Sequence, residues 1–160
     1  MFIEERGLLK NLSLFLPQLK IAEKCGSSVV ALNPSKVDLK KEIDALTDGY
    51  GCDVYIELTG NPQSVRQGLD CIARHGRFVE YAVFGKEVTA DWSIISDCKE
   101  LTIVGGHLGP RQWPKAIEMV ANKQLPIDDI ITHKFPLAKF LEGIKMVIAS
   151  TESIKVMLIP

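Results

Sequence analysis

The sequence of 160 residues contains no hydrophobic run that approaches the roughly 20 residues needed to cross a bilayer, and no basic run longer than a dipeptide. Its 19 Lys and Arg residues balance 20 Asp and Glu residues, which leaves a formal net charge of -1. Glu4 and Glu5 stand near the amino terminus, where a secretory signal peptide would carry basic charge. We therefore expect a soluble, cytoplasmic protein that binds neither membranes nor nucleic acids.

Motifs for metal binding are absent from the sequence as well. The four cysteines are Cys25, Cys52, Cys71 and Cys98, and the three histidines are His75, His107 and His133. The cysteines are far apart and form no CxxC pair, and the histidines have neither HExxH spacing nor a neighbouring thiol. This pattern is typical of reduced, packed thiols, and we expect no metal ligand and no catalytic residue in this sequence.

What the sequence does contain is an alternation of strand and helix patterns. Apolar strands are expected over residues 27–34, 52–60, 77–85, 101–106 and 154–159. Helices are expected over residues 17–25, 38–46, 61–76, 113–123 and 137–149. Asp38 and Asn61-Pro62 stand where the second and third of these helices would begin. The alternation predicts an α/β domain with a parallel sheet and helices on its faces.

Three of the expected strands end in small residues. In a parallel sheet, ligands bind beyond the carboxyl ends of the strands, and glycine allows a flat ligand to approach the backbone closely. The three stretches are Leu58-Thr59-Gly60, Val83-Phe84-Gly85 and Val104-Gly105-Gly106. The pattern is compatible both with a ligand site and with ordinary turns after strands.

Several stretches carry a family resemblance. In their order and spacing, "CDVYIELTG", "RFVEYAVFG", "LTIVGGHLG" and "ESIKVML" resemble the second half of a zinc-dependent medium-chain alcohol dehydrogenase, and most of all its polyol branch of sorbitol, threonine and erythritol/threitol dehydrogenases. The resemblance runs from Gln18 to Pro160. It implies a truncated, Rossmann-like doubly wound parallel sheet that binds NAD over residues 1–106, followed at 107–160 by the returning C-terminal segment of the catalytic domain.

The resemblance also implies where a cofactor would lie. Thr59 and Gly60 match positions beside NAD, and Ala82, Val83 and Phe84 match positions along the nicotinamide side. Gly85, which follows them, is also expected to contact the cofactor. The third stretch, Val104, Gly105 and Gly106, matches the carboxamide end. Lys155 matches a basic residue that reaches the cofactor pyrophosphate, although a solvated charge on a strand is the alternative interpretation.

The sequence departs from this family in two ways. It has no strand followed by a GxGxxG turn and no acid for the ribose hydroxyls, and it has no zinc ligands. Residues 1–16 match the family poorly, and "LSLFL" at 12–16 either forms a replacement strand or stays loose. We expect the C-terminal fragment of an NAD-dependent, zinc-containing polyol dehydrogenase, inactive alone, with NAD binding weak or lost. A non-catalytic dimerising module and a small nucleotide-binding protein are the alternatives.

The resemblance finally implies self-association. In the family, the segment "VTADWSIISDCKELTIVGG" supplies the outer sheet edge that pairs with its copy across a two-fold axis. An exposed strand edge with apolar side chains is a template for pairing. We therefore expect a homodimer or larger homo-oligomer joined through a strand near Trp92, with Ile94 and Ile95 beside it.

Overall fold

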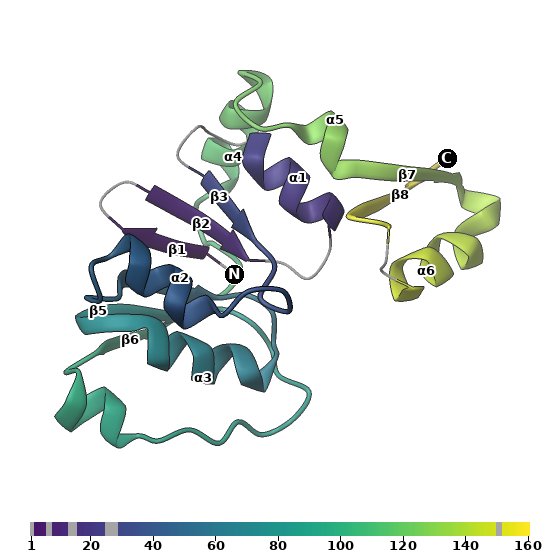
Figure 1. Cartoon of the computed structure of the whole chain (residues 1–160). Helices are drawn as coiled ribbons and strands as arrows, with labels where there is room; N and C mark the ends of the chain where they lie inside the picture. The colour runs from purple at the N-terminus through teal and green to yellow at the C-terminus, as the bar shows by residue number, and fades with distance from the viewer. Residues whose placement is uncertain (1, 6–7, 13–15, 25–28, 150–151) are drawn as a thin grey trace.

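The computed structural model describes residues 2–5, 8–12, 16–24, 29–149 and 152–160, arranged in two sheets with helices around them (Figure 1). In chain order the elements are β1 (Phe2–Glu5), β2 (Leu8–Leu12), α1 (Leu16–Lys24), β3 (Val29–Leu32), α2 (Leu39–Leu46), β4 (Cys52–Glu57), α3 (Pro62–Cys71), β5 (Ile72–Glu80), η1 (Ile94–Cys98), β6 (Thr102–Gly105), α4 (Trp113–Ala121), α5 (Ile127–Ile130), β7 (Ile131–Pro136), η2 (Leu137–Lys139), α6 (Phe140–Ala149) and β8 (Lys155–Ile159).

The larger sheet has six strands in the order β3-β2-β1-β4-β5-β6. This is the 3-2-1-4-5-6 order of a doubly wound sheet, and β4, β5 and β6 are parallel, as the alternating pattern predicts. One strand differs: β1 is antiparallel to both of its neighbours, β2 and β4. The position of the first strand is thus occupied by a strand of the opposite direction. The replacement strand expected at 12–16 is instead β2, which ends at Leu12, and residues 13–15 lie outside the described residues.

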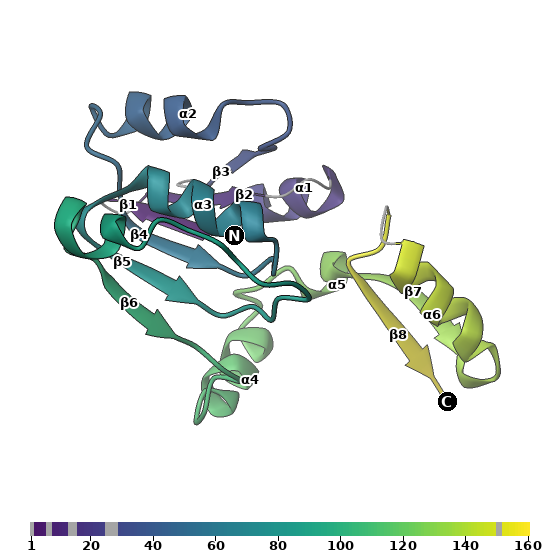
Figure 2. The same cartoon turned by 90° about the horizontal axis from the view of Figure 1, so that it is seen from below.

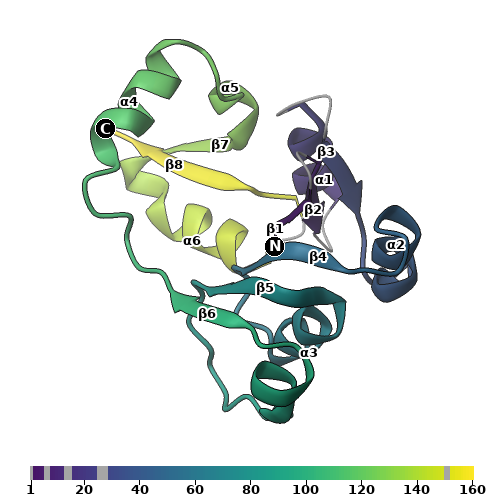
Figure 3. The ribbon, with the colours of Figure 1, turned by 90° about the vertical axis from the view of Figure 1, so that its left-hand side faces the viewer.

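Helices cover both faces of this sheet. Strand β3 lies beyond β2 on one side, and the chain then crosses back to β4, so right-handed crossovers put α1 on one face and α2 on the other. Helices α2 and α3 lie together on that second face, as Figure 3 shows. The main core is between α3 and the sheet, where the rings of Tyr55 and Phe78 stack with centroids 5.3 Å apart. A Cβ added at Gly68 of α3 would meet both rings, so this glycine sets how closely the helix approaches.

Local sequence signals explain where two helices begin. The side chain of Asp38 accepts a hydrogen bond from the backbone N–H of Lys41 at the start of α2. Asn61 caps α3 in the same way through the N–H of Gln63, with Pro62 in the first turn. Both predicted starts are confirmed. The predicted end of α3 at residues 74–76 is wrong, because the chain leaves the helix after Cys71 and β5 begins at once.

The segment around Trp92 is not a strand, so the expected pairing strand there is wrong. Trp92 is a turn residue with 74% of its surface exposed, and it precedes the π-helical turn η1. The backbone N–H groups of Ile94 and Ile95 bond to the carbonyls of Asp91 and Trp92, and both isoleucines pack against the main core. This packing favours a helical turn over an extended segment. The last part of the expected segment does form an edge of the sheet, as strand β6, and β3 is the other edge.

The C-terminal residues form a second unit. Strands β7 and β8 pair in parallel, and α6 lies on them, with Gly143 close to Phe135, Val156 and Leu158 (Figure 2). Many apolar side chains of α6 are exposed, among them Leu141, Ile144, Val147 and Ile148. None of the helices in the described part of the chain is long and apolar enough to span a membrane.

Candidate functional site

The carboxyl ends of β4, β5 and β6 stop at the same level of the sheet. Glu57 is in register with Glu80, and Glu80 is in register with Gly105. Hydrogen bonds continue just past these ends: the N–H of Tyr81 donates to the carbonyl of Glu57, and the N–H of Gly106 donates to that of Glu80, at 3.1 and 2.8 Å. The first predicted stretch, Leu58-Thr59-Gly60, therefore directly follows β4, and the third, Val104-Gly105-Gly106, lies at the end of β6. The second, Val83-Phe84-Gly85, lies beyond the end of β5 at Glu80, so the predicted end of this strand at residue 85 is wrong.

Close contacts leave no room for a side chain at two of the predicted glycines. A Cβ added at Gly60 would lie 2.6 Å from the carbonyl oxygen of Val83, and Gly60 has a φ of +68°. A Cβ added at Gly106 would lie 2.4 Å from the ring of Tyr81. Gly85 and Gly105, by contrast, have open space around them. The structure thus places Thr59-Gly60 against Val83, and Gly105-Gly106 beside the same strand end.

A buried carboxylate lies beneath the first of these turns. The side chain of Glu57 has no exposed surface, and its carboxylate accepts hydrogen bonds from the N–H and the hydroxyl of Thr59 and from the N–H of Gly60. Burial opposes ionisation of Glu57, but these bonds and one from the Ser64 hydroxyl outweigh burial and lower its pKa. The alternation along β4 is compatible with a Glu57 carboxylate beside the cleft but favours an ordinary half-buried strand residue, because nothing in the pattern shows that the following turn folds back.

A second carboxylate, Glu80, ends the neighbouring strand on the same face of the sheet. It accepts a hydrogen bond from the N–H of Ala82 at 2.9 Å. Partial burial and the negative charge of Glu57 raise the pKa of Glu80. Strands β4 and β5 therefore both end in a carboxylate, and in each case the carboxylate accepts a hydrogen bond from the backbone that follows the strand.

The direction of β1 removes the place where a phosphate loop would begin. Because β1 is antiparallel to β4, its amino end at Phe2 lies beside Ile56, near the carboxyl end of β4. A phosphate-binding turn would need a strand that ends at this edge and leads into a helix, whose free N–H groups hold the phosphate. Strand β1 ends at the opposite edge, so this position of the sheet supplies no such turn.

Lys155 is the predicted site residue on the second sheet. It is the first residue of β8, its side chain is exposed, and its carbonyl accepts a hydrogen bond from the Thr132 hydroxyl. Figure 2 shows that the arrowheads of β4 and β5 point towards the β7–β8 unit, and that the amino end of β8 is the end nearer the larger sheet. Lys155 therefore lies on a different sheet from the other predicted cofactor residues.

Metal-ligating groups do not gather in the described part of the chain, where no three His, Cys, Asp or Glu side chains are close enough to hold an ion. The thiols of Cys52 and Cys71 are buried, and that of Cys98 is exposed. Burial raises the pKa of Cys71 to about 12, which keeps this thiol protonated at neutral pH. The donor set that a catalytic zinc requires is thus not found among these residues.

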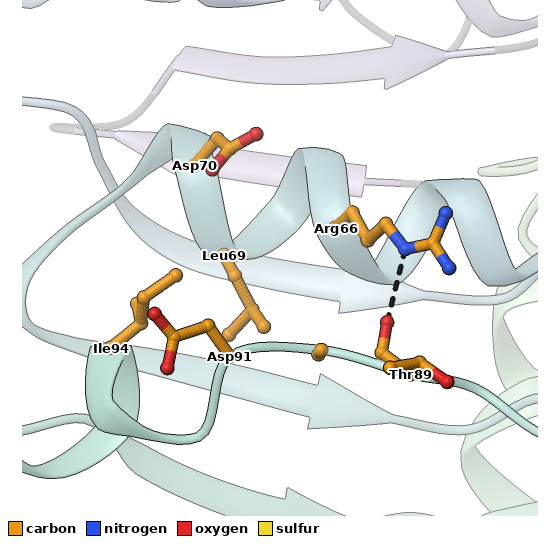
Figure 4. A pocket seen from close by; sticks show the side chains of 7 residues that line it. Arg66, Leu69, Asp70, Thr89, Asp91 and Ile94 are labelled. Atoms are coloured by element: carbon orange, nitrogen blue, oxygen red, sulfur yellow. Dashed lines mark hydrogen bonds between the residues drawn. The ribbon is translucent and has the colours of Figure 1, made fainter.

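A pocket outside the strand ends lies between α3 and the segment before η1 (Figure 4). Arg66, Leu69, Asp70, Thr89, Ala90, Asp91 and Ile94 line it. The Nε of Arg66 donates to the carbonyl of Thr89 at 3.0 Å and joins the two walls. No predicted cofactor residue lines this pocket, so it is separate from the strand-end site.

Comparison with protein families places this arrangement. The profile of the zinc-binding dehydrogenases matches residues 17–122, which is more than half of the chain. The chain belongs to the zinc-binding dehydrogenase family. The predicted family resemblance and the Rossmann-like fold class are both confirmed. The division at residue 106 and the cofactor-contacting residues stay predictions.

Known members give the extent of the match. The chain is 53% identical over 143 residues to an erythritol/L-threitol dehydrogenase of Mycolicibacterium smegmatis, covering 89% of this chain and 39% of that protein. It is 29% identical over 155 residues to a sorbitol dehydrogenase of Halalkalibacterium halodurans, covering 96% of this chain and 44% of that protein. This zinc-binding dehydrogenase chain therefore spans less than half the length of these relatives.

Solved structures agree with this assignment. The structure of 2R,3R-butanediol dehydrogenase from Bacillus subtilis matches with a TM-score of 0.81 and 26% identity, over 94% of this chain and 43% of that one. A zinc-binding dehydrogenase from Sinorhizobium meliloti 1021, solved bound to NADP, matches with a TM-score of 0.77 and 24% identity, over 94% of this chain and 44% of that one. The second likeness supports the fold alone.

Proposed function

We propose that this chain is the C-terminal part of an NAD-dependent polyol dehydrogenase, that it forms one wall of the nucleotide site, and that it is inactive alone. The observation that carries the proposal is the set of parallel strand ends at β4, β5 and β6, where Gly60 lies against Val83 and Gly106 against Tyr81. The 53% identity to an erythritol/L-threitol dehydrogenase supports a polyol as the substrate class.

The described residues fit one part of the cofactor and not the other. Thr59-Gly60, Val83-Phe84-Gly85 and Val104-Gly105-Gly106 offer glycine backbone together with mostly apolar side chains, which suit the flat nicotinamide end. When bound, NAD would accept a hydride from the alcohol. The pyrophosphate has no glycine-rich turn to hold it, and Lys155 is the predicted basic group for it. The zinc of the family does not fit the described side chains, because no three potential ligands among them lie close together.

The affinity for NAD tests this proposal. A site that lacks the phosphate turn and the ribose acid loses at least two charge-assisted hydrogen bonds, each worth about 1.5 to 3 kcal/mol. Such a loss takes a micromolar dissociation constant to about millimolar or weaker. We expect titration calorimetry of the purified chain with NAD to show no micromolar binding, and NMR titration to show weak binding at the strand ends.

The same preparation separates the alternatives. We expect no NADH to form from erythritol or sorbitol with NAD, and turnover that a chelator abolishes would contradict the proposed inactivity. Micromolar NAD affinity without turnover would instead favour a small nucleotide-binding protein. Complete absence of NAD binding, together with self-association, would favour a non-catalytic dimerising module.

Self-association through β6 is a second proposed property, because this strand ends the sheet and its residues are exposed. Within the described residues, β6 pairs with β5 on one side only. We expect Ile103→Lys on β6 to lower the dimer association constant by about tenfold or more, since charge on an edge strand opposes pairing. Sedimentation velocity at micromolar concentrations measures this. Leu46→Lys, an exposed position on α2, is the matched control.

One outcome would contradict the proposed dimer directly. A folded monomer of 17.7 kDa at all concentrations would exclude self-association. Dissociation by Leu46→Lys as strongly as by Ile103→Lys would place the contact somewhere other than β6. Ile94→Lys is not a suitable test, because Ile94 packs against the core and the change would disturb folding.

A further inference from the structure

The turn after β4 is the part of the strand-end site that rests on a buried charge. All the hydrogen bonds described for the Glu57 carboxylate come from the turn and helix that follow it: the N–H of Thr59 at 2.9 Å, the Thr59 hydroxyl, the N–H of Gly60 at 3.1 Å and the Ser64 hydroxyl. Each of these groups donates, so the arrangement requires an acceptor with both oxygens available. An ionised carboxylate meets that requirement and a protonated one does not.

The same turn is fixed from its outer side. Gly60 lies so close to the carbonyl of Val83 that no side chain fits between them, and its φ of +68° suits glycine. The Thr59 hydroxyl also accepts a hydrogen bond from the N–H of Asn61 at 3.1 Å, and Asn61 caps α3. The turn is thus held on one side by the Glu57 carboxylate and on the other by Val83, in the segment that follows β5.

A short chain of hydrogen bonds links Glu57 to the core. The Tyr55 hydroxyl donates to the carbonyl of Ser64 at 2.7 Å and lies 3.2 Å from the Ser64 hydroxyl, which in turn bonds to Glu57. Tyr55 and Glu57 have no exposed surface. The orientation of the carboxylate is therefore set by the packing of α3 on the sheet, before any ligand arrives.

We propose that Glu57 is a positioning residue for the nucleotide site: its buried carboxylate draws the donors of Thr59 and Gly60 inward and so presets the backbone wall that Thr59, Gly60 and Val83 offer to the cofactor. This inference rests on the proposed nucleotide site and adds a residue that touches no ligand. The role is preorganisation, since a turn fixed in advance loses less conformational freedom on binding.

Glu57→Gln tests the proposal because it keeps the shape and removes one acceptor, leaving an amide NH₂ to face a backbone N–H. We expect hydrogen exchange of the Thr59 and Gly60 amides to become about tenfold faster or more, while exchange in β5, followed at Phe78, stays within about twofold. We also expect the dissociation constant for NAD, measured by NMR titration, to rise about fivefold or more. Glu87→Gln, an exposed position with the same change of charge, is the control.

A second variant covers the case in which Glu57→Gln does not fold. Thr59→Val removes one donor but leaves the carboxylate, so we expect the pKa of Glu57, followed by carboxyl ¹³C shifts, to rise and the Gly60 amide to exchange faster. An unchanged Glu57 pKa, or acceleration of exchange spread evenly over the whole sheet, would overturn the positioning role. A wild-type chain that gives no NAD response would overturn the proposed nucleotide site, whereas NAD binding with unchanged Thr59 and Gly60 exchange in Glu57→Gln would overturn this inference alone.

Discussion

Tyr55→Ala is expected to lower the free energy of unfolding by about 4 kcal/mol, the largest effect of any single change considered for this chain. Tyr55 has no exposed surface and stacks on Phe78 between the sheet and α3. Gly68 brings the helix so close that its backbone lies against the Tyr55 ring. Removing the ring leaves a cavity that α3 cannot fill by a small shift, because hydrogen bonds at both of its ends hold it in place.

Chemical denaturation with urea, followed by circular dichroism, measures this loss. Tyr50→Ala is the matched control, because Tyr50 has 61% of its surface exposed and its removal is expected to change stability by about 0.5 kcal/mol or less. Equal effects of the two substitutions would show that the packing of α3 on the sheet is not the main core. Complete loss of cooperative unfolding for Tyr55→Ala agrees with the expectation in a small domain.

Lys99→Met is expected to lower the free energy of unfolding by about 3 kcal/mol. The Lys99 ammonium donates to the carbonyls of Leu69, Asp70 and Ile72, at 2.6, 3.0 and 2.7 Å. These are carbonyls at the end of α3, which have no partner within the helix. Partial burial lowers the pKa of Lys99, yet the three acceptors and the negative end of the helix dipole favour the charged form.

Met keeps the length of the side chain and removes its donors, so the loss measures the hydrogen bonds more than the packing. Lys115→Met is the control: Lys115 is exposed on α4, with its ammonium 4.0 Å from the Glu118 carboxylate, and such surface pairs contribute about 0.5 kcal/mol or less. Thermal or urea unfolding of both variants decides the matter. A Lys99→Met chain as stable as Lys115→Met would mean that water satisfies the α3 carbonyls equally well.

Local signals were enough to predict part of this structure. Asp38 and Asn61 carry their capping function in their own side chains, so the helix starts follow from a few neighbouring residues. The glycines at 60 and 106 were predicted to lie at strand ends, and the alternation of elements indicated a parallel sheet. These features depend on short stretches of chain, where residue type and spacing determine the outcome.

Other features depend on contacts that no short stretch contains. The β-branched pair Ile94-Ile95 favours a strand locally, and packing against the core makes it a helical turn instead. The acceptors of Lys99 lie 27 to 30 residues earlier in the chain. Glu57 looks like an ordinary strand residue until the turn after it is known to fold back. The predicted role of Lys155 depends on how two separate sheets face each other, which sequence spacing does not specify.

The reversed strand β1 shows that completing a sheet and building a ligand site are different demands. A strand satisfies its neighbours' backbone hydrogen-bonding groups in either direction, and an antiparallel hairpin does so with a tight turn, whereas a parallel pair needs a crossover of a dozen residues or more. Strands β1 and β2 fill two neighbouring positions of the sheet as an antiparallel pair. Anion binding has a polarity that backbone pairing lacks, because only a strand that ends at the correct edge can aim a helix amino terminus at a phosphate. A sheet can therefore keep its strand order and its hydrogen bonding while the direction of one strand, on which phosphate binding depends, is reversed.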